Sequence, residues 1–267
     1  MRFVTFNPYR ALGVPGARYI KPEHWFRERE AVREADWVLF PETWQVNALV
    51  YALGKRIFPS LPSYHLGRDK IEMTRAFEAC VPQHLPRTLI LPAGRAAVEQ
   101  VCEELSFPLV LKEPRNARGM GVFRVEDERA LREHAARLDV LYVQELLPIE
   151  RDVRVVWVGD GIVTAYWRRG ADGFLNNVSQ GGTVDFGEIP ERALELVRLI
   201  APRLGIDYAG FDIAMVGGWP YLLEFNLFFG NEALNARGIR LAARILDYLS
   251  RRTPSPREPE PRLPKAV

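Results

Sequence analysis

The chain has 267 residues, 48% of them hydrophobic and 26% charged, with a formal net charge of +2. These values are typical of a globular protein with room for two or three small compact units, and they argue against a general polyanion binder, so we expect no nucleic-acid partner. No stretch resembles a membrane span or a signal peptide, so we expect no membrane partner. Cys80 and Cys102 lack metal-ligand spacing, which favours reduced thiols and a cytoplasmic location.

Residues 1–66 have the pattern of a small α/β unit. Short apolar runs alternate with amphipathic segments, which favours a parallel sheet. We expect strands at 3–6, 37–40 and 56–58, and helices at 22–35 and 42–53. Glu42 and Thr43 follow a predicted strand end, where open sheets place ligand-contacting loops, although the start of a helix explains them equally well.

Two lysines in the next part of the chain are candidates for binding an anion. Lys70 lies in the first turn of a helix predicted from about residue 69 to 78, where the helix dipole disfavours a cation. Lys112 ends the apolar strand 109–112, and Gly119 and Gly121 follow it in a short loop. Glycine backbone N–H groups and a lysine can together bind a phosphate. A solvated lysine and a tight hairpin turn are the simpler alternatives.

The segment from 87 to 145 alternates strand and helix, and it leads into a predicted hairpin of strands at 152–158 and 162–169. In the hairpin, Asp152 and Arg154 share a strand face, and Arg168 lies on the returning strand. The two arginines are either surface ion-pair partners or donors to a phosphoryl group. A polar, glycine-rich loop containing Asn177 follows.

After a helix predicted at 190–204, the stretch 208–226 reads as a second hairpin with Gly217-Gly218 at its turn. If the turn centres on Gly218, Asp212 and Glu224 are each six residues from it and face each other, and Asn226 returns to the same face. Two carboxylates and an amide oxygen are ligands suited to Mg²⁺. A last helix is predicted at 237–249, and the proline-rich tail, residues 251–267, cannot build a core.

These motifs, taken in order, resemble the ATP-grasp superfamily and most closely its RimK-like ligases. The resemblance covers roughly residues 69–249 and rests on eight short motifs at compatible spacings. They are Asp69-Lys70, Pro108–Lys112, Gly119-Met-Gly121, Val143–Glu145, Asp152–Arg169, Asn177 before Gly181-Gly182, Asp207–Asp212 and Leu223–Asn226.

The resemblance implies an α/β (α+β) ATP-grasp fold in which two α+β subdomains grip ATP. The expected division is an N-terminal unit at 1–66 that helps form the acceptor pocket, a lid subdomain at 67–145, a metal-binding subdomain at 146–250, and the disordered tail. Roles for individual residues follow from the same resemblance. Lys70 and Lys112 would contact the phosphates, under a loop containing Gly119 and Gly121. The backbone of the hinge would recognise adenine, at Gln144, Glu145, Leu146 and Leu147, and Asp152 would contact the ribose. Arg154, Arg168 and Asn177 would lie near the γ-phosphate, and two Mg²⁺ ions, or Mn²⁺ as a substitute, would be held by Asp212, Glu224 and Asn226.

The implied activity is ATP- and Mg²⁺-dependent joining of a small-molecule or peptide carboxylate to an amine through an acyl phosphate. The alternatives are an ATP-grasp phosphotransferase acting on a small-molecule acceptor, or a non-catalytic ATP-binding partner protein. Three features on the acceptor side depart from the family: Leu227-Phe-Phe-Gly230 after Asn226, no basic residue around Asn177, and a short N-terminal unit. Glutamate-to-peptide ligation is therefore not implied, and a homo-oligomer remains open.

Overall fold

The computed structural model describes residues 1–115, 121–170 and 182–253. The chain divides into two compact units. The first contains Met1–Ile57 together with the C-terminal segment that begins at Arg240, and the second is Phe58–Ile239. The division at residues 66, 145 and 250, which the family resemblance implies, concerns functional subdomains and stays a prediction.

The first unit is built on a four-stranded sheet in the order β2-β1-β3-β4, with β1 parallel to both β2 and β3. Its strands are short and its helices irregular. They are β1 (Phe3–Thr5), β2 (Ala17–Tyr19), β3 (Trp37–Leu39), β4 (Ile57–Phe58), a 3₁₀ turn at Pro22–His24, α1 (Arg29–Glu34), α2 (Thr43–Asn47) with a π-helical turn at Ala48–Ala52, and α9 (Leu241–Arg252). Strands β1 and β3 are fully buried, as expected for parallel strands covered on both faces.

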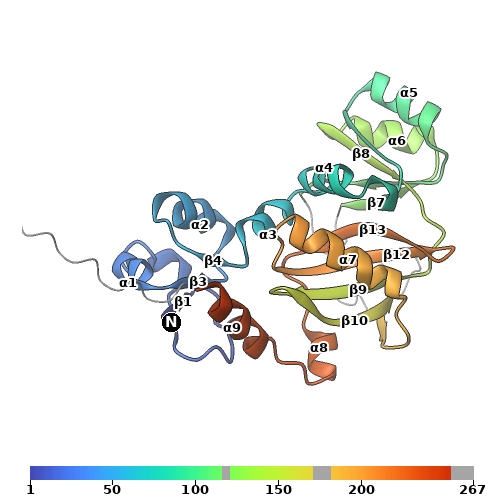
Figure 1. Ribbon diagram of the computed structural model, residues 1–267. Coiled ribbons are helices and arrows are strands. Elements are labelled where there is room, and N and C mark those ends of the chain that lie inside the picture. The colour runs from blue at the N-terminus through green and yellow to red at the C-terminus, as the bar shows by residue number, and fades with distance from the viewer. Residues whose placement is uncertain (116–120, 171–181, 254–267) are drawn as a thin grey trace, which may run out of the picture. The chain divides into compact units, whose positions relative to one another are not determined.

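Helix α9 belongs to this first unit although it comes last in the chain (Figure 1). The Trp37 indole donates to the Thr253 hydroxyl at 2.8 Å, and an Arg56 guanidinium nitrogen donates to the Arg252 carbonyl at 3.4 Å. A side chain at Gly13 would place its Cβ 3.1 Å from the Cβ of Ala242, so the loop after β1 lies close against the helix. The N-terminal unit is therefore completed by residues from the end of the sequence.

The second unit contains two sheets. The smaller has the order β5-β8-β6-β7, is antiparallel, and is covered by α5 and α6 (Figure 1). Valine and leucine side chains of these strands and helices form a separate core. Its elements are β5 (Thr88–Pro92), α5 (Arg95–Glu104), β6 (Leu109–Lys112), β7 (Val122–Val125), α6 (Glu128–Ala135) and β8 (Val140–Glu145).

The larger sheet has the order β11-β10-β9-β12-β13. Alternating side chains of β9 and β12 (Val153, Val155, Phe211 and Ile213 among them) pack with helix α7, which covers one face (Figure 1). The opposite face carries the polar residues. The elements are β9 (Arg151–Val158), β10 (Gly161–Arg169), β11 (Thr183–Asp185), α7 (Glu191–Arg203), β12 (Tyr208–Val216), β13 (Trp219–Asn226) and α8 (Glu232–Ala236); α3 (Leu61–Leu66), α4 (Lys70–Cys80) and a 3₁₀ turn at Pro82–His84 precede both sheets.

The β12–β13 hairpin pairs Asp212 with Glu224, as predicted, although its turn and its register differ from those expected. The turn is the two-residue type, with Gly217 and Gly218 both at positive φ (57° and 78°), and the ladder starts at Val216 and Trp219. A β-bulge then leaves Leu223 without a partner. The turn therefore centres between Gly217 and Gly218 and not on Gly218, and the bulge restores the pairing of Asp212 with Glu224 that was predicted from a turn centred on Gly218.

Most other predicted elements are confirmed with shifted ends. The helix expected at 22–35 is broken into a 3₁₀ turn and α1, and α9 starts four residues later than predicted because Arg237 and Gly238 close off α8 instead. Several short elements were not predicted, namely β2, α3, the 3₁₀ turn at Pro82–His84, β11 and α8. Glu42 caps α2 through a capping box with Gln45, which agrees with the plainer of its two interpretations.

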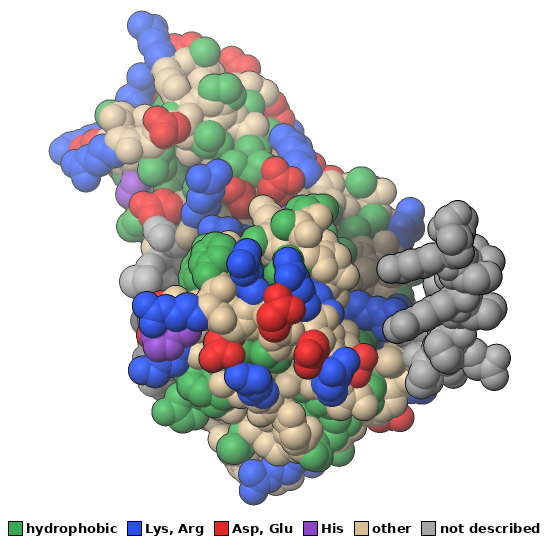
Figure 2. Space-filling model, turned by 90° about the vertical axis from the view of Figure 1, so that its left-hand side faces the viewer, with side chains coloured by type: hydrophobic (Ala, Val, Ile, Leu, Met, Phe, Trp, Pro, Cys, Tyr) green, Lys and Arg blue, Asp and Glu red, His purple; other side chains and the backbone are tan. Residues whose placement is uncertain are grey.

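Acidic and basic side chains are interspersed over the face of the molecule that Figure 2 presents. Exposed ion pairs in the described part of the chain include Arg18 with Glu28 (2.6 Å) and Arg2 with Glu34 (3.2 Å). Exposed pairs of this kind contribute little to stability. Within the described part of the chain, none of the helices combines the length and the apolar character that crossing a membrane requires.

The two-glycine turn gives a direct test of the hairpin geometry. Replacing Gly217 by valine should lower the free energy of unfolding by about 1–2 kcal/mol, because a β-branched residue is strained at positive φ. Urea denaturation followed by circular dichroism would measure the change. Gly217→Asn is the matched control, since asparagine tolerates this backbone region, and equal destabilisation by both substitutions would contradict the assigned turn.

Candidate functional site

One face of the larger sheet gathers the predicted site residues in register. Across the sheet, Tyr166 pairs with Arg154, Arg154 with Asp212, and Asp212 with Glu224, so the four form one row from β10 to β13. Flanking rows place Asn226 opposite Gly210 and Arg168 opposite Asp152. Because side chains alternate along a strand, these polar groups share the face opposite the apolar core.

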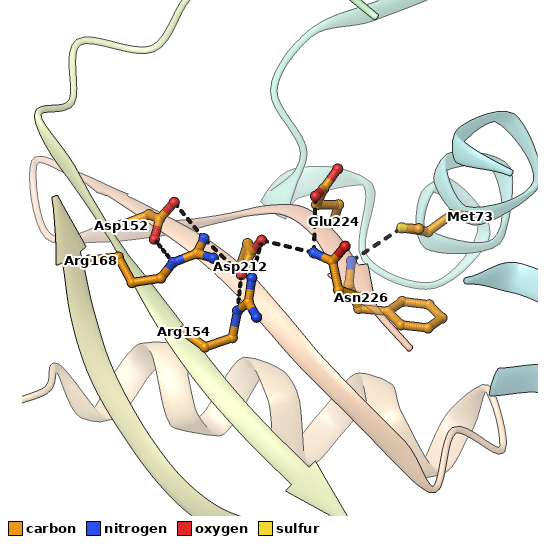
Figure 3. Close-up of polar contacts among 8 residues, drawn as sticks. Met73, Asp152, Arg154, Arg168, Asp212, Glu224 and Asn226 are labelled. Carbon is orange, nitrogen blue, oxygen red and sulfur yellow. Dashed lines mark hydrogen bonds and ion pairs between the residues drawn. The ribbon is translucent and has the colours of Figure 1, made fainter. Parts of the chain in front are cut away.

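Asp212 is the centre of this face (Figure 3). Arg154 binds it in a bidentate manner, with Nε donating to Oδ1 and Nη2 donating to Oδ2 at 3.0 Å. Nη2 of Arg168 lies 2.9 Å from Oδ1 of Asp212, and the Asn226 amide donates to Oδ2 at 3.2 Å. A carboxylate has about four lone-pair positions, and these four contacts occupy them, one of them through the Asn226 amide nitrogen.

Arg168 also binds Asp152 through two hydrogen bonds of 2.8 Å each. Burial raises the pKa of Asp152 to about 6, against the effect of Arg168, so at pH 7 the carboxyl group is still mainly ionised. Burial alone lowers the pKa of Arg168, but Asp212 and Asp152 together raise it above its ordinary value. Removing one member of such a buried charged set leaves another unpaired, which is costly.

The two remaining oxygen ligands lie at the open edge of the row. The Asn226 amide donates to Glu224 Oε1 at 3.0 Å as well as to Asp212, so its nitrogen lies between the two carboxylates (Figure 3). Rotating this amide by half a turn would direct its oxygen to the same point. Within the described residues no group of three His, Cys, Asp or Glu side chains could hold a metal ion. Two carboxylates and an amide nevertheless fit Mg²⁺, which in nucleotide sites takes further ligands from phosphates and water.

The predicted phosphate lysines approach this row from other elements. Lys112, at the end of β6, is buried, and its Nζ donates to the Gln144 side chain at 2.8 Å. Burial lowers its pKa to about 8, opposed by Glu224 and Asp212 and assisted by Lys70, so these four groups interact electrostatically. Lys70 itself is buried at the first position of α4.

Helix α4 positions Lys70 because it contacts both sheets. The hydroxyl of Thr74 on α4 lies 2.7 Å from the hydroxyl of Tyr142 on β8. The N–H of Phe225 on β13 donates to Sδ of Met73 on α4 at 3.3 Å. Asp69 caps the helix by accepting from the Ile71 N–H at 2.9 Å. The sequence-predicted helix and its first-turn lysine are therefore fixed from both sides.

The remaining predicted residues lie on β8, in the segment after it, and beside the stretch 116–120. Gln144 and Glu145 still belong to β8, where Gln144 uses its side chain to hold Lys112 and the Glu145 N–H donates to the Arg87 carbonyl at 2.9 Å. The chain leaves the sheet only at Leu146 and Leu147. Gly121 is the first described residue after the stretch 116–120, and its carbonyl accepts from the Glu113 N–H at 2.7 Å. Gly119 and Asn177 lie outside the described residues.

Sequence reasoning missed Tyr166. This residue is 3% exposed and occupies the same row as Arg154, and its ring lies 5.7 Å from that of Phe186. Alternation along β10 places it on the same face as Arg168, two residues further on. Counting back from the turn would instead have paired Arg154 with Ala165, because the β9–β10 ladder shifts its register between Ile162 and Thr164. Burial raises the pKa of its hydroxyl, while Arg154 and Arg168 act in the opposite direction.

The fold defines the class of protein. D-alanine–D-alanine ligase from Bacillus anthracis has a similar structure, with a TM-score of 0.69 at 15% identity over 94% of this chain and 96% of that one. An ATP-grasp RimK domain protein from Sphaerobacter thermophilus superposes with a TM-score of 0.67 at 19% identity, over 93% of this chain and 99% of that one. The chain thus has the fold of the ATP-grasp ligases, with a second unit built from two α+β parts as predicted.

The family follows from the sequence match. Residues 80–249 match the RimK-like ATP-grasp domain, and the chain belongs to that family. A probable alpha-L-glutamate ligase of an Enterobacter species is 30% identical over 73% of this chain and 70% of its own length. A tetrahydromethanopterin:alpha-L-glutamate ligase of Methanocaldococcus jannaschii is 36% identical over 44% of each chain, so the match spans less than half of that relative. The predictions of fold, family and class, an ATP-dependent ligase that joins a carboxylate to an amine, are confirmed.

Lys112 predicts a pH dependence of nucleotide binding. Because its pKa is about 8, its charge is present below pH 8 and is lost as the pH rises through that value. If Lys112 binds a phosphate, the affinity for ADP should fall by about tenfold between pH 7 and pH 9.5, within the range expected for one charged hydrogen bond. Isothermal titration calorimetry without metal would measure it. Lys112→Arg, which stays charged, should remove most of this fall, and an equal fall in both proteins would contradict the assignment.

Proposed function

We propose that the chain condenses a carboxylic acid with an amine in two steps, through an acyl phosphate, using the row from Arg154 to Glu224 as its phosphoryl-transfer site. In the first step a carboxylate oxygen of the acid attacks the γ-phosphorus of ATP, and ADP leaves. In the second step the amine nitrogen attacks the acyl carbon, phosphate leaves, and the amine loses a proton. The products are an amide, ADP and inorganic phosphate.

The single observation that carries this proposal is the convergence of cations and oxygen ligands on one small region. Arg154, Arg168 and Lys112 supply positive charge around Asp212 and Glu224. Phosphoryl transfer needs little covalent chemistry from a protein, and positioning together with charge stabilisation accounts for most of the rate. Side chains already held by buried ion pairs need little rearrangement when charge develops on the transferred group.

In this proposal, each residue has a defined task. Lys112 and Lys70 hold the phosphates, and Arg154 and Arg168 stabilise the charge on the transferred phosphoryl group. Glu224 and Asn226 hold Mg²⁺, with Asp212 sharing its charge between the metal and the arginines. The ion would neutralise phosphate oxygens and orient them for the in-line attack. Asp152 keeps Arg168 in place through its bidentate contact, while the predicted contact with the ribose remains a prediction.

The relatives suggest the first substrates to test. Those that match this chain include ligases named for L-glutamate and a human beta-citrylglutamate synthase B, 32% identical over 58% of this chain and 42% of its own length. We propose an amino acid as the amine, with glutamate as the first candidate. The partners are then two small molecules, or one small molecule and a peptide. A cytoplasmic location remains part of the proposal.

Replacing Glu224 by alanine should lower ATP turnover by at least about 10²–10³-fold, because a metal ligand beside the transferred phosphoryl group is lost. A coupled assay of ADP release would measure turnover, and circular dichroism would verify the fold. The exposed Glu195 on helix α7 offers the matched control, Glu195→Ala. Undiminished turnover in the Glu224 variant would refute the site.

A screen of paired acids and amines, with glutamate in the first set, tests the reaction itself. ADP release should require both an acid and an amine, and mass spectrometry should find an amide whose mass equals the sum of the two less water. ADP release that needs only one hydroxylic acceptor, with a phosphorylated product, would instead establish a phosphotransferase.

A further inference from the structure

Gly210 lies two residues before Asp212 on the same strand and the same face of the sheet, and it is buried. Its φ angle is not among the positive values found in this chain, so glycine is not needed there for backbone conformation. What distinguishes the position is that neighbouring side chains already occupy the place where its own side chain would lie. A Cβ built at Gly210 would lie 2.9 Å from both Cδ and Nη1 of Arg154.

The Arg154 side chain therefore crosses directly over the Gly210 backbone on its way to Asp212. Carbon–carbon contacts normally stay near 3.5–4.0 Å, so a methyl group at position 210 and the present path of Arg154 exclude each other. The path matters because the guanidinium must arrive in the plane that allows both Nε and Nη2 to donate to Asp212.

Phe229 lies on another side of the same position and also leaves no room for a side chain there. The same Cβ would lie 3.1 Å from the Cβ of Phe229. Phe229 is 2% exposed, and its ring stacks on Tyr208 with centroids 4.9 Å apart. Tyr208 is itself buried on β12, so the phenylalanine has little freedom to withdraw. Phe229 belongs to Leu227-Phe-Phe-Gly230, the short segment between β13 and α8.

We infer that Gly210 is a positioning residue, whose missing side chain, bounded by Phe229, makes a seat that directs the Arg154 guanidinium onto Asp212. Its effect on the reaction rests on the proposed role of Arg154. Gly210 does not touch the reacting atoms; it acts through the arginine alone. A displacement of about 1 Å in such a group can lower a rate by about 10²-fold.

The experiment compares Gly210→Ala with the wild-type chain by two independent readouts. The first is the NMR signal of the Arg154 Nε–H group, assigned by its loss in Arg154→Ala; it should exchange slowly with water in the wild type and rapidly in Gly210→Ala. The second is turnover, in which kcat should fall by about 10²-fold. Gly187→Ala is the matched control, since its Cβ would meet only the flexible Asp185 side chain at 3.3 Å.

A double variant isolates the mechanism. In the Arg154→Ala background, Gly210→Ala should cause no further loss of kcat, because the group that it displaces is absent. If Gly210→Ala alone fails to fold while Arg154→Ala folds, the double variant should fold as Arg154→Ala does, since both 2.9 Å contacts are removed. Unchanged Nε–H exchange in Gly210→Ala, additive losses of kcat, or a double variant that fails to fold although Arg154→Ala folds would each overturn the inference.

The outcomes also separate this inference from the proposed function. Rapid Nε–H exchange with unchanged kcat would support the seat and would refute the role of Arg154 in phosphoryl transfer. Loss of kcat with an unchanged Nε–H signal would overturn the seat and leave the proposed reaction standing.

Discussion

The contact between Asp212 and Arg154 is the constraint on which the functional face depends. Asp212 lies on the central part of the sheet and pairs in register with Arg154 on one side and Glu224 on the other. Through Arg168 it connects to Asp152, and through Asn226 it connects to Glu224. One carboxylate on β12 thus contacts side chains of three further strands, β9, β10 and β13, and it helps to orient the charged groups of the row.

Such an arrangement costs stability rather than adding to it. Asp152, Arg154, Arg168 and Asp212 are all 4–6% exposed, and taking charges out of water has a penalty of several kcal/mol per ion that pairing only partly offsets. Well-packed apolar residues would hold these strands together at least as well. Retaining four buried charges on one face, while Val153, Val155, Phe211 and Ile213 fill the other, is therefore consistent with selection for chemistry at this face.

How much was predictable can be followed along the hairpins. Strict alternation in the strands around Arg154 and Asp212 identifies the face and most of its residues, because the side-chain period of a strand is independent of tertiary contacts. The bulge at Leu223 was not predictable, since it depends on how both Leu222 and Phe225 reach the same core. The bidentate contacts of the two arginines could not be predicted either, because Arg168 and Asp152 are 16 positions apart and Arg154 and Asp212 are 58 positions apart. The membership of α9 in the first unit needs a long-range contact that no local pattern encodes.

That last feature has a consequence for synthesis of the chain on the ribosome. Roughly 180 residues separate the end of β4 from the helix that completes its unit, so at about 5–20 residues per second the first unit waits on the order of 10–40 s for its final element. During that interval Trp37 of β3 and the loop around Gly13 lack their partners at Thr253 and Ala242. Vectorial translation thus favours an order of assembly in which the second unit, Phe58–Ile239, is complete before the first unit closes.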